Sequence, residues 1–172
     1  MKAPEFDLLS VDGKRYSPVT ARGDKGLLVM FICNHCPYVK RVIDGIVRDC
    51  KTLAPLGIGA IAVMSNDPAD YPEDSFENMK RVAREKGFPF PYVIDETQDV
   101  ARAYGALCTP EFYGFDAALE LQYHGRFDEM LAAMKRIAET GKGPKEQIPS
   151  VGCSIKWKRG QDPFFEKGSW VM

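Results

Sequence analysis

Unbroken apolar runs alternate with helical repeats of apolar residues along the first part of the chain. Residues 27–32 and 58–64 are apolar throughout and have the length of strands, so we expect each to be buried on both faces of a sheet. Between these runs, apolar side chains recur at helical spacing from Pro37 onward, until Pro55 and Gly57 end the pattern. Strand, helix and strand in this order favour a mostly parallel sheet.

The same signals, together with turn residues, extend the prediction to about residue 140. Asp12-Gly13 is a strong turn signal and predicts an N-terminal hairpin within residues 6–16. Downstream, the expected elements are a helix from about Asp74 to Gly87, a short strand over residues 91–94, a helix from Thr97 to Gly105, two strand-like runs at 111–115 and 119–124 joined as a hairpin, and a helix over about 129–139. This order predicts an α/β domain with a central sheet.

The length and composition are those of one soluble domain. The chain has 172 residues, of which 45% are hydrophobic and 27% charged, enough apolar material for a sizeable core. We expect residues 1–140 to form this domain. Residues 141–172, rich in Gly, Pro and Lys and without clear periodicity, are expected to be a C-terminal extension packed on the same domain, and within it only residues 151–157 favour an extended segment.

Charge and hydropathy exclude several classes of partner. The formal net charge of −1 supplies no basic field for a phosphate backbone, so nucleic acid is not an expected partner. No segment approaches the ~18 consecutive apolar residues that a membrane helix needs, and the first residues lack the apolar core of a signal peptide. We therefore expect a cytoplasmic protein. Its five cysteines, an odd number, fit a reducing compartment in which most thiols are free.

Two of these cysteines, Cys33 and Cys36, are three positions apart, just after the first apolar run and at the start of the following helix. Thiols at this spacing can close a small disulfide ring, and the amides of a helix start favour the thiolate. On such a turn the first cysteine sits at the exposed end and the second one turn inward. We predict Cys33 as the nucleophile that attacks an external disulfide, and Cys36 as the thiol that resolves the mixed disulfide; the reverse steps would oxidise a substrate.

His35 lies between the two cysteines and is predicted as the third catalytic residue. A protonated or hydrogen-bonding imidazole there would stabilise a thiolate and raise the reduction potential of the dithiol. The alternative for His35 is a solvent-facing spacer. The alternative for the dithiol is half of a zinc site, but the other donors in the chain, Cys50, Cys108, Cys153 and His124, include no second CxxC pair. We therefore expect no metal and no other cofactor.

The order of elements, with the CxxC turn early and Thr109-Pro110 before the last hairpin, resembles the thioredoxin-like superfamily over nearly residues 1–140. This resemblance implies a three-layer α/β fold: a central mixed sheet flanked by helices, with the N-terminal hairpin and the C-terminal extension added. It also implies that Pro110 is cis and that Thr109 and Pro110 line a substrate groove beside the dithiol. The sequences 34–38 (NHCPY) and 152–157 (GCSIKW) are similar to the bacterial redoxin branch grouped with the AhpC/TSA peroxiredoxin-like proteins.

Two departures from these families affect the chemistry. Residues 27–32 hold no acidic side chain of the kind that thioredoxins place behind the dithiol, so proton transfer must use Glu111, His35 or water. Phe31 and Ile32 precede Cys33, where peroxiredoxins carry a threonine that orients the peroxide. Cys108, next to Thr109, is expected to approach the dithiol on the same loop, either to exchange with it or as a small apolar side chain; Cys108 and Glu111 are thus candidate accessory residues. Cys153 is expected to be a structural residue, with a resolving role by folding back of the C-terminal segment as the alternative.

Three functions remain open at this point. The first is a thiol-disulfide oxidoreductase acting on a protein or small-molecule disulfide or thiol. The second is a peroxiredoxin-like thiol peroxidase, in which one cysteine forms a sulfenic acid with peroxide and the other resolves it. The third is a non-catalytic binding or redox-sensing module, with an extended peptide bound near Thr109-Pro110 by strand-like pairing. The sequence favours the first.

Overall fold

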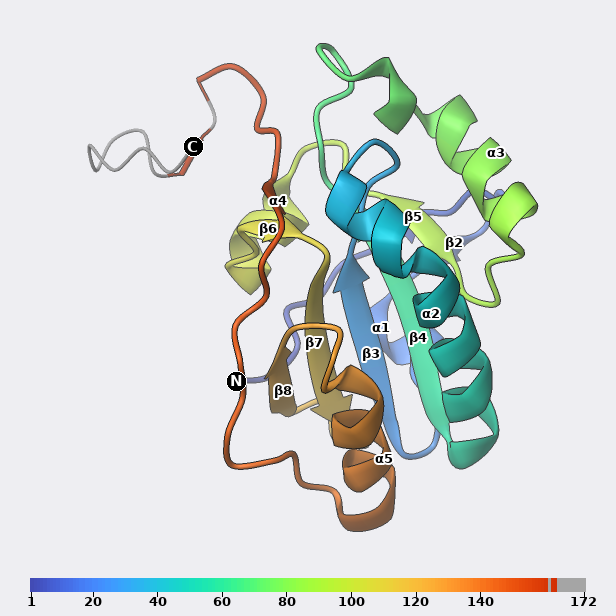
Figure 1. The fold of residues 1–172 in the computed structure, drawn as a ribbon, viewed down its shortest axis with the longest axis vertical. Coiled ribbons are helices and arrows are strands. Elements are labelled where there is room, and N and C mark those ends of the chain that lie inside the picture. Colours follow the sequence, from blue (N-terminus) through green and yellow to red (C-terminus); the bar gives the residue numbers. More distant parts are fainter. Residues whose placement is uncertain (161, 164–172) are drawn as a thin grey trace.

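A mixed sheet lies at the centre of the molecule (Figure 1). The computed structural model describes residues 1–160 and 162–163, and the rest of the predicted C-terminal extension, residues 161 and 164–172, lies outside this range. In spatial order the strands are β5 (Tyr92–Ile94), β4 (Ile58–Met64), β3 (Gly26–Phe31), β7 (Glu111–Asp116) and β8 (Leu121–Gly125). β3, β4 and β5 run parallel to one another, whereas β7 is antiparallel to both β3 and β8. This arrangement confirms the predicted thioredoxin-like α/β fold.

The pairing of β3 with β7 determines where the site forms. Phe31, the last residue of β3, pairs with Val63 on one side and with Glu111, the first residue of β7, on the other. Because β3 and β7 run in opposite directions, the residues that follow β3 meet those that precede β7. Cys33 and Pro110 therefore come to the same edge of the sheet although they are far apart in the sequence.

Helices cover both faces of the sheet. α2 (Pro37–Leu53), α3 (Phe76–Lys86) and α5 (Met130–Thr140) pack on one face, and α1 (Pro18–Ala21) and α4 (Asp99–Tyr104) on the other (Figure 1). Alternate residues of β3 serve the two cores: Leu28 and Met30 lie in the first, and Leu27 and Val29 in the second. Since a strand directs successive side chains to opposite faces, this explains why the run has no polar position.

Most predicted elements are present within a few residues of their expected bounds, and two helix starts differ. α3 begins at Phe76, because Pro72–Asp74 forms a separate 3₁₀ turn (η2) before it. α4 begins at Asp99, whose amide donates to the Thr97 hydroxyl at 3.3 Å. The buried Asp95 adds a second cap, since its carboxylate accepts the amide hydrogens of Val100 and Ala101 at 3.2 and 2.9 Å. A carboxylate at a helix N-terminus satisfies amides that lack an intrahelical partner.

Two short ladders complete the fold. The predicted N-terminal hairpin consists of β1 (Leu8–Leu9) and β2 (Arg15–Tyr16). The second ladder pairs β6 (Cys108–Thr109) with β9 (Cys153–Ser154) and places the C-terminal part of the chain beside the dithiol. A 3₁₀ turn, η1 (Ala54–Leu56), follows α2. Among the described residues, no helix has both the length and the apolar character needed to cross a membrane.

Candidate active site

The two cysteines of the CxxC turn lie where β3 passes into α2. Cys33 follows the end of β3, and Cys36 is the N-cap residue of α2, with Pro37 as the first helical residue. Proline fits there because its missing amide hydrogen would have had no partner within the helix. Both sulfurs are free thiols and are largely enclosed: Cys33 is 3% exposed and Cys36 0%.

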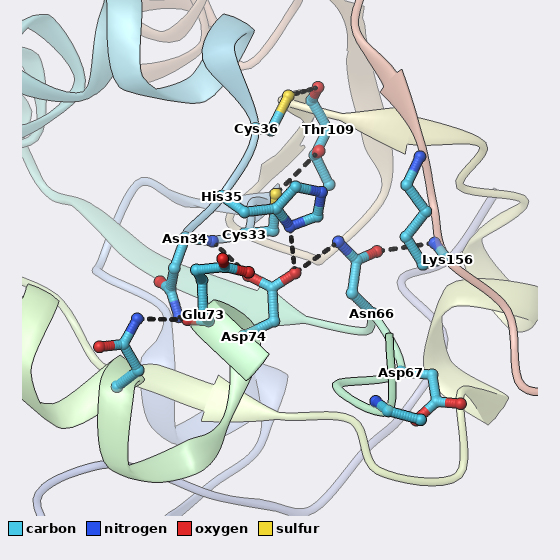
Figure 2. A network of polar contacts seen from close by, with 12 residues as sticks. Cys33, Asn34, His35, Cys36, Asn66, Asp67, Glu73, Asp74, Thr109 and Lys156 are labelled. Atoms are coloured by element: carbon cyan, nitrogen blue, oxygen red, sulfur yellow. Dashed lines mark hydrogen bonds and ion pairs between the residues drawn. The ribbon is translucent and has the colours of Figure 1, made fainter. Parts of the chain in front are cut away.

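Both sulfurs converge on Thr109, which precedes a cis peptide bond to Pro110 (Figure 2). The Cys33 sulfur lies 3.4 Å from the Thr109 hydroxyl, and the Cys36 thiol donates to the Thr109 carbonyl at 3.5 Å. The structure thus brings together the dithiol and the Thr109-Pro110 segment that the sequence predicted beside it.

The two thiols perturb one another. A hydrogen bond from Cys33 lowers the pKa of Cys36 to about 4, against the opposing effect of burial, and the same contact together with burial raises the pKa of Cys33. The amide of Val39 in the first turn of α2 also stabilises the Cys36 thiolate. The two pKa values shift in opposite directions, so the pair titrates as one coupled unit in which the charge is favoured on Cys36.

A buried carboxylate, Asp74, organises the turn between the cysteines (Figure 2). It is 0% exposed and belongs to η2. One oxygen accepts the Asn34 amide at 2.7 Å, and the other accepts the Asn66 side chain at 3.1 Å and contacts Nδ1 of His35. An ionised carboxylate only accepts hydrogen bonds, so this contact places the His35 proton on Nδ1 and leaves Nε2 to exchange a proton. His35 is therefore held in place and is not the solvent-facing spacer.

Further contacts fix the same turn. The ring of His35 stacks on Tyr71, with 4.3 Å between ring centroids. The Asn34 side chain accepts the buried Tyr92 hydroxyl at 2.8 Å and donates to the backbone of Glu73 at 2.9 Å. Asn34, an ordinary spacer in the sequence, thus ties the dithiol turn to β5 and to η2.

Sequence reasoning missed Asp74 because its local context has a simpler explanation. An acidic residue just before a helical pattern is favoured by the helix dipole, so Asp74 appeared only as a helix start. Its contact with Asn34 spans 40 residues of the chain and depends on the parallel pairing of β3 with β4.

The predicted accessory residues, Cys108 and Glu111, contact each other and belong to a second polar cluster. The Cys108 thiol donates to the Glu111 carboxylate at 3.5 Å, and burial and this carboxylate raise the pKa of Cys108 to about 12. Glu111 also accepts the Tyr113 hydroxyl at 2.7 Å and contacts Nε2 of His124 at 2.7 Å. His124 is thus a satisfied side chain, and the carboxylate of Glu111 is committed to this second cluster.

Of the remaining cysteines, only Cys153 joins the dithiol. Cys153 pairs with Thr109 across the β6–β9 ladder and packs on the same apolar cluster as Cys33 and Cys36. Cys50 lies on the buried side of α2, where burial raises its pKa to about 12. Cys50 is therefore a packing residue of the core.

The structure also identifies one group of potential metal ligands among the described residues. Cys33, His35 and Asp74 can each offer one ligand atom, with these atoms within 4.8 Å of one another. This group is not the zinc site considered as an alternative in the sequence analysis, because it includes none of the four further donors named there: Cys50, Cys108, Cys153 and His124. Both oxygens of Asp74 already accept hydrogen bonds from protein groups, so this carboxylate holds His35 in position.

Comparisons with known proteins agree with this geometry. The family model described as AhpC/TSA family matches residues 1–124. An uncharacterized conserved protein from Geobacillus kaustophilus is 45% identical, with a TM-score of 0.88 over 92% of this chain and 91% of its own. A hypothetical protein from Sinorhizobium meliloti is 32% identical, with a TM-score of 0.89 over 93% and 94%.

A more distant structure, a thioredoxin-family thiol:disulfide interchange protein from Chlorobium tepidum, is 23% identical, with a TM-score of 0.65 over 81% of this chain and 94% of its own. At this identity the likeness concerns the fold alone. No curated protein matches the chain.

Proposed function

Since the chain belongs to the AhpC/TSA family, we propose that it is a thiol-disulfide oxidoreductase that cycles Cys33 and Cys36 between a dithiol and a disulfide. Its substrates would be disulfides or thiols of proteins or small molecules. The observation that carries this proposal is the convergence of both CxxC sulfurs on Thr109, at 3.4 and 3.5 Å, beside a cis proline and at the start of a long helix.

Cys33 is proposed as the attacking sulfur because Cys36 is fully enclosed, whereas Cys33 retains a small exposed surface. Attack on a substrate disulfide forms a bond between Cys33 and one substrate sulfur and releases the other as a thiolate. The Cys36 sulfur then attacks Cys33 and displaces the bound substrate sulfur. The protein gains the Cys33–Cys36 disulfide, and the substrate leaves as two thiols.

His35 would handle the proton that Cys33 must lose. A ring nitrogen of His35 and an oxygen of Asp74 lie within 4.8 Å of the Cys33 sulfur. With Nδ1 directed to Asp74, the other nitrogen is the one that can exchange a proton, so we assign to it the transfer of the Cys33 proton, directly or through water, to a leaving thiolate. Asp74 would act as a positioning residue that holds the imidazole. This pair would replace the acidic side chain that residues 27–32 lack.

The test is a single turnover with reduced protein and a small aromatic disulfide whose released thiolate absorbs light. We expect one equivalent of disulfide to be consumed as two protein thiols are lost. Cys33→Ser should abolish the reaction, and Cys36→Ser should accumulate a mixed disulfide at Cys33. Cys50→Ala, which alters a cysteine remote from Thr109, should react like the wild type. Full activity of Cys33→Ser, or a mixed disulfide trapped at Cys36 in that variant, would overturn the assignment.

A thiol peroxidase is the second candidate, and membership of the AhpC/TSA family favours it. In that reaction the Cys33 thiolate takes one oxygen from a peroxide to give a sulfenic acid and an alcohol or water. Cys36 then forms the disulfide and releases water. Peroxide consumption coupled to a dithiol donor tests this candidate. A rate no higher than that of a free thiol would exclude it, while the single-turnover assay above remains independent of it.

A further inference from the structure

A third thiol lies at the dithiol because the chain returns to the site after α5. β9 runs antiparallel to β6, and in this ladder Cys153 is the partner of Thr109. Thr109 is also the residue on which both dithiol sulfurs converge. The β6–β9 ladder therefore holds Cys153 beside the dithiol, although Cys153 comes 117 positions after Cys36 in the sequence (153 − 36).

The returning segment is anchored on both sides of Cys153. Downstream, the amide of Ile155 donates to the Leu107 carbonyl at 3.0 Å, and the Lys156 amide donates to the Asn66 side chain at 2.8 Å (Figure 2). Upstream, Gly152 approaches Thr109 so closely that an added Cβ would lie 2.0 Å from the Thr109 carbonyl oxygen. A residue with a side chain would push β9 away, so glycine permits the contact that brings Cys153 to the site.

The sulfur of Cys153 lies among the groups that stabilise the dithiol. Its surroundings include the Cys36 sulfur and the backbone of Tyr38 in the first turn of α2. Burial, followed by the contact with Cys36, raises the pKa of Cys153 to about 11, while the Tyr38 amide and Lys156 oppose the rise. The backbone amides at the start of α2 thus favour the thiolate form of two cysteines, Cys36 and Cys153.

Exposure differs within this group of three. Cys36 is fully enclosed and Cys33 nearly so, whereas Cys153 is only half-buried. A disulfide between Cys33 and Cys36 would therefore offer little surface to an incoming reductant. A disulfide that includes Cys153 would offer more.

We propose that Cys153 is a third redox-active thiol of this site, which attacks the Cys36 sulfur of the oxidised dithiol and becomes the position at which a thiol reductant returns electrons. This inference rests on the proposed function, which supplies the Cys33–Cys36 disulfide. In the exchange the Cys33–Cys36 bond breaks and a Cys36–Cys153 bond forms, so there is no net oxidation. The proton of Cys153 passes to the released Cys33 thiolate.

Reduction then proceeds from the accessible side. One molecule of a monothiol attacks Cys153 and releases Cys36; a second attacks the mixed disulfide and leaves as the oxidised dimer of the reductant. Two electrons enter and both protein thiols are restored. Cys33 meanwhile stays free at the Thr109-Pro110 segment, so substrate and reductant use different sulfurs.

The first experiment uses Cys33→Ser, which leaves four cysteines (five less one). After treatment with diamide, which oxidises a pair of thiols, we expect two titratable thiols to be lost and a Cys36–Cys153 peptide to be found by mass spectrometry. Cys33→Ser/Cys108→Ala is the matched control and should behave identically, whereas Cys33→Ser/Cys153→Ser should keep its thiols. Retention of four thiols in Cys33→Ser, or a bond from Cys36 to Cys108, would overturn the proposal.

The second experiment separates this inference from the proposed function. With Cys153→Ser, reduction of one equivalent of substrate disulfide should still go to completion, because Cys33 and Cys36 are intact. Re-reduction of the oxidised protein by reduced glutathione should be at least tenfold slower. Equal re-reduction rates would refute the role of Cys153 and leave the oxidoreductase standing; failure of the wild-type single turnover would refute the oxidoreductase itself. Peptide mapping of briefly oxidised wild-type protein supplies a check that needs no variant.

Discussion

Replacing the buried carboxylate in Asp74→Asn tests the network on which the dithiol turn is built. Asp74 accepts hydrogen bonds from three donors: the Asn34 amide, the Asn66 side chain and Nδ1 of His35. Asparagine has the same shape but only one accepting oxygen, and its NH₂ group would face a donor in either orientation. With the oxygen kept toward His35 and Asn66, the Asn34 amide loses its acceptor.

The magnitude follows from these contacts. A buried donor left without an acceptor costs about 1–3 kcal/mol, and the two remaining hydrogen bonds each lose about 1 kcal/mol when their acceptor becomes neutral. Removing a buried charge offsets part of this loss. We therefore expect the free energy of unfolding of Asp74→Asn to fall by about 2–4 kcal/mol. For a chain of this length, the melting temperature would fall by about 4–16 °C.

The assays are urea unfolding and the single-turnover reduction of a small disulfide, both over a range of pH. Because Asp74 holds His35 as the proton acceptor, we expect the turnover rate to fall at least about tenfold, with a changed pH profile. Glu73→Gln, which neutralises the exposed neighbouring carboxyl, should leave both quantities near wild type. Unchanged stability would refute the network, and a destabilised variant with the wild-type rate and pH profile would refute the proton-transfer role.

Three further predictions concern single contacts. The reduced protein should show a thiolate that titrates near pH 4 by ultraviolet absorbance and is missing in Cys36→Ser; a first thiolate near the unfolded pKa of 9.0 would contradict this. Since the folded pKa of about 4 lies below the unfolded pKa, the stability that this group contributes should grow as pH rises from 4 to 9 and vanish as pH falls through 4. Thr109→Val removes the hydroxyl 3.4 Å from the Cys33 sulfur, and we expect alkylation of Cys33 to slow about fivefold at unchanged melting temperature, so equal rates would count against that contact. Gly152→Ala should destabilise the protein by about 1–3 kcal/mol in urea unfolding, because the new Cβ meets the Thr109 carbonyl, whereas the exposed Ser154→Ala two residues later should not; equal stabilities would be the contrary result.

The local parts of the structure were predictable from the sequence because they depend on short-range patterns. Apolar runs of strand length and the repeat after Pro37 predicted β3, β4 and α2 almost to the residue. The CxxC turn was visible because its chemistry requires only two cysteines at fixed spacing. Thr109-Pro110 could be placed beside it only through the resemblance to a known fold.

The residues that complete the site could not be predicted, since their positions depend on contacts between distant segments. Asp74 carries the same local signal as many surface residues at helix starts. For Cys153 the sequence favoured a structural role over a resolving one, because the segment has no periodicity and β9, only two residues long, leaves no repeat that would place it at the dithiol. Glu111, a candidate proton acceptor in the sequence, was placed by the fold in a separate cluster with Cys108 and His124.

The convergence of both sulfurs on Thr109 has a consequence for biosynthesis. Cys33 leaves the ribosome 76 residues before Thr109, the residue that contacts both thiols. Until that later segment emerges and β7 joins the sheet, the CxxC turn lacks this neighbour and the enclosure that accompanies it. The nascent chain thus carries two unshielded sulfhydryl groups, and their reactivity matures only when nearly two thirds of the polypeptide has emerged.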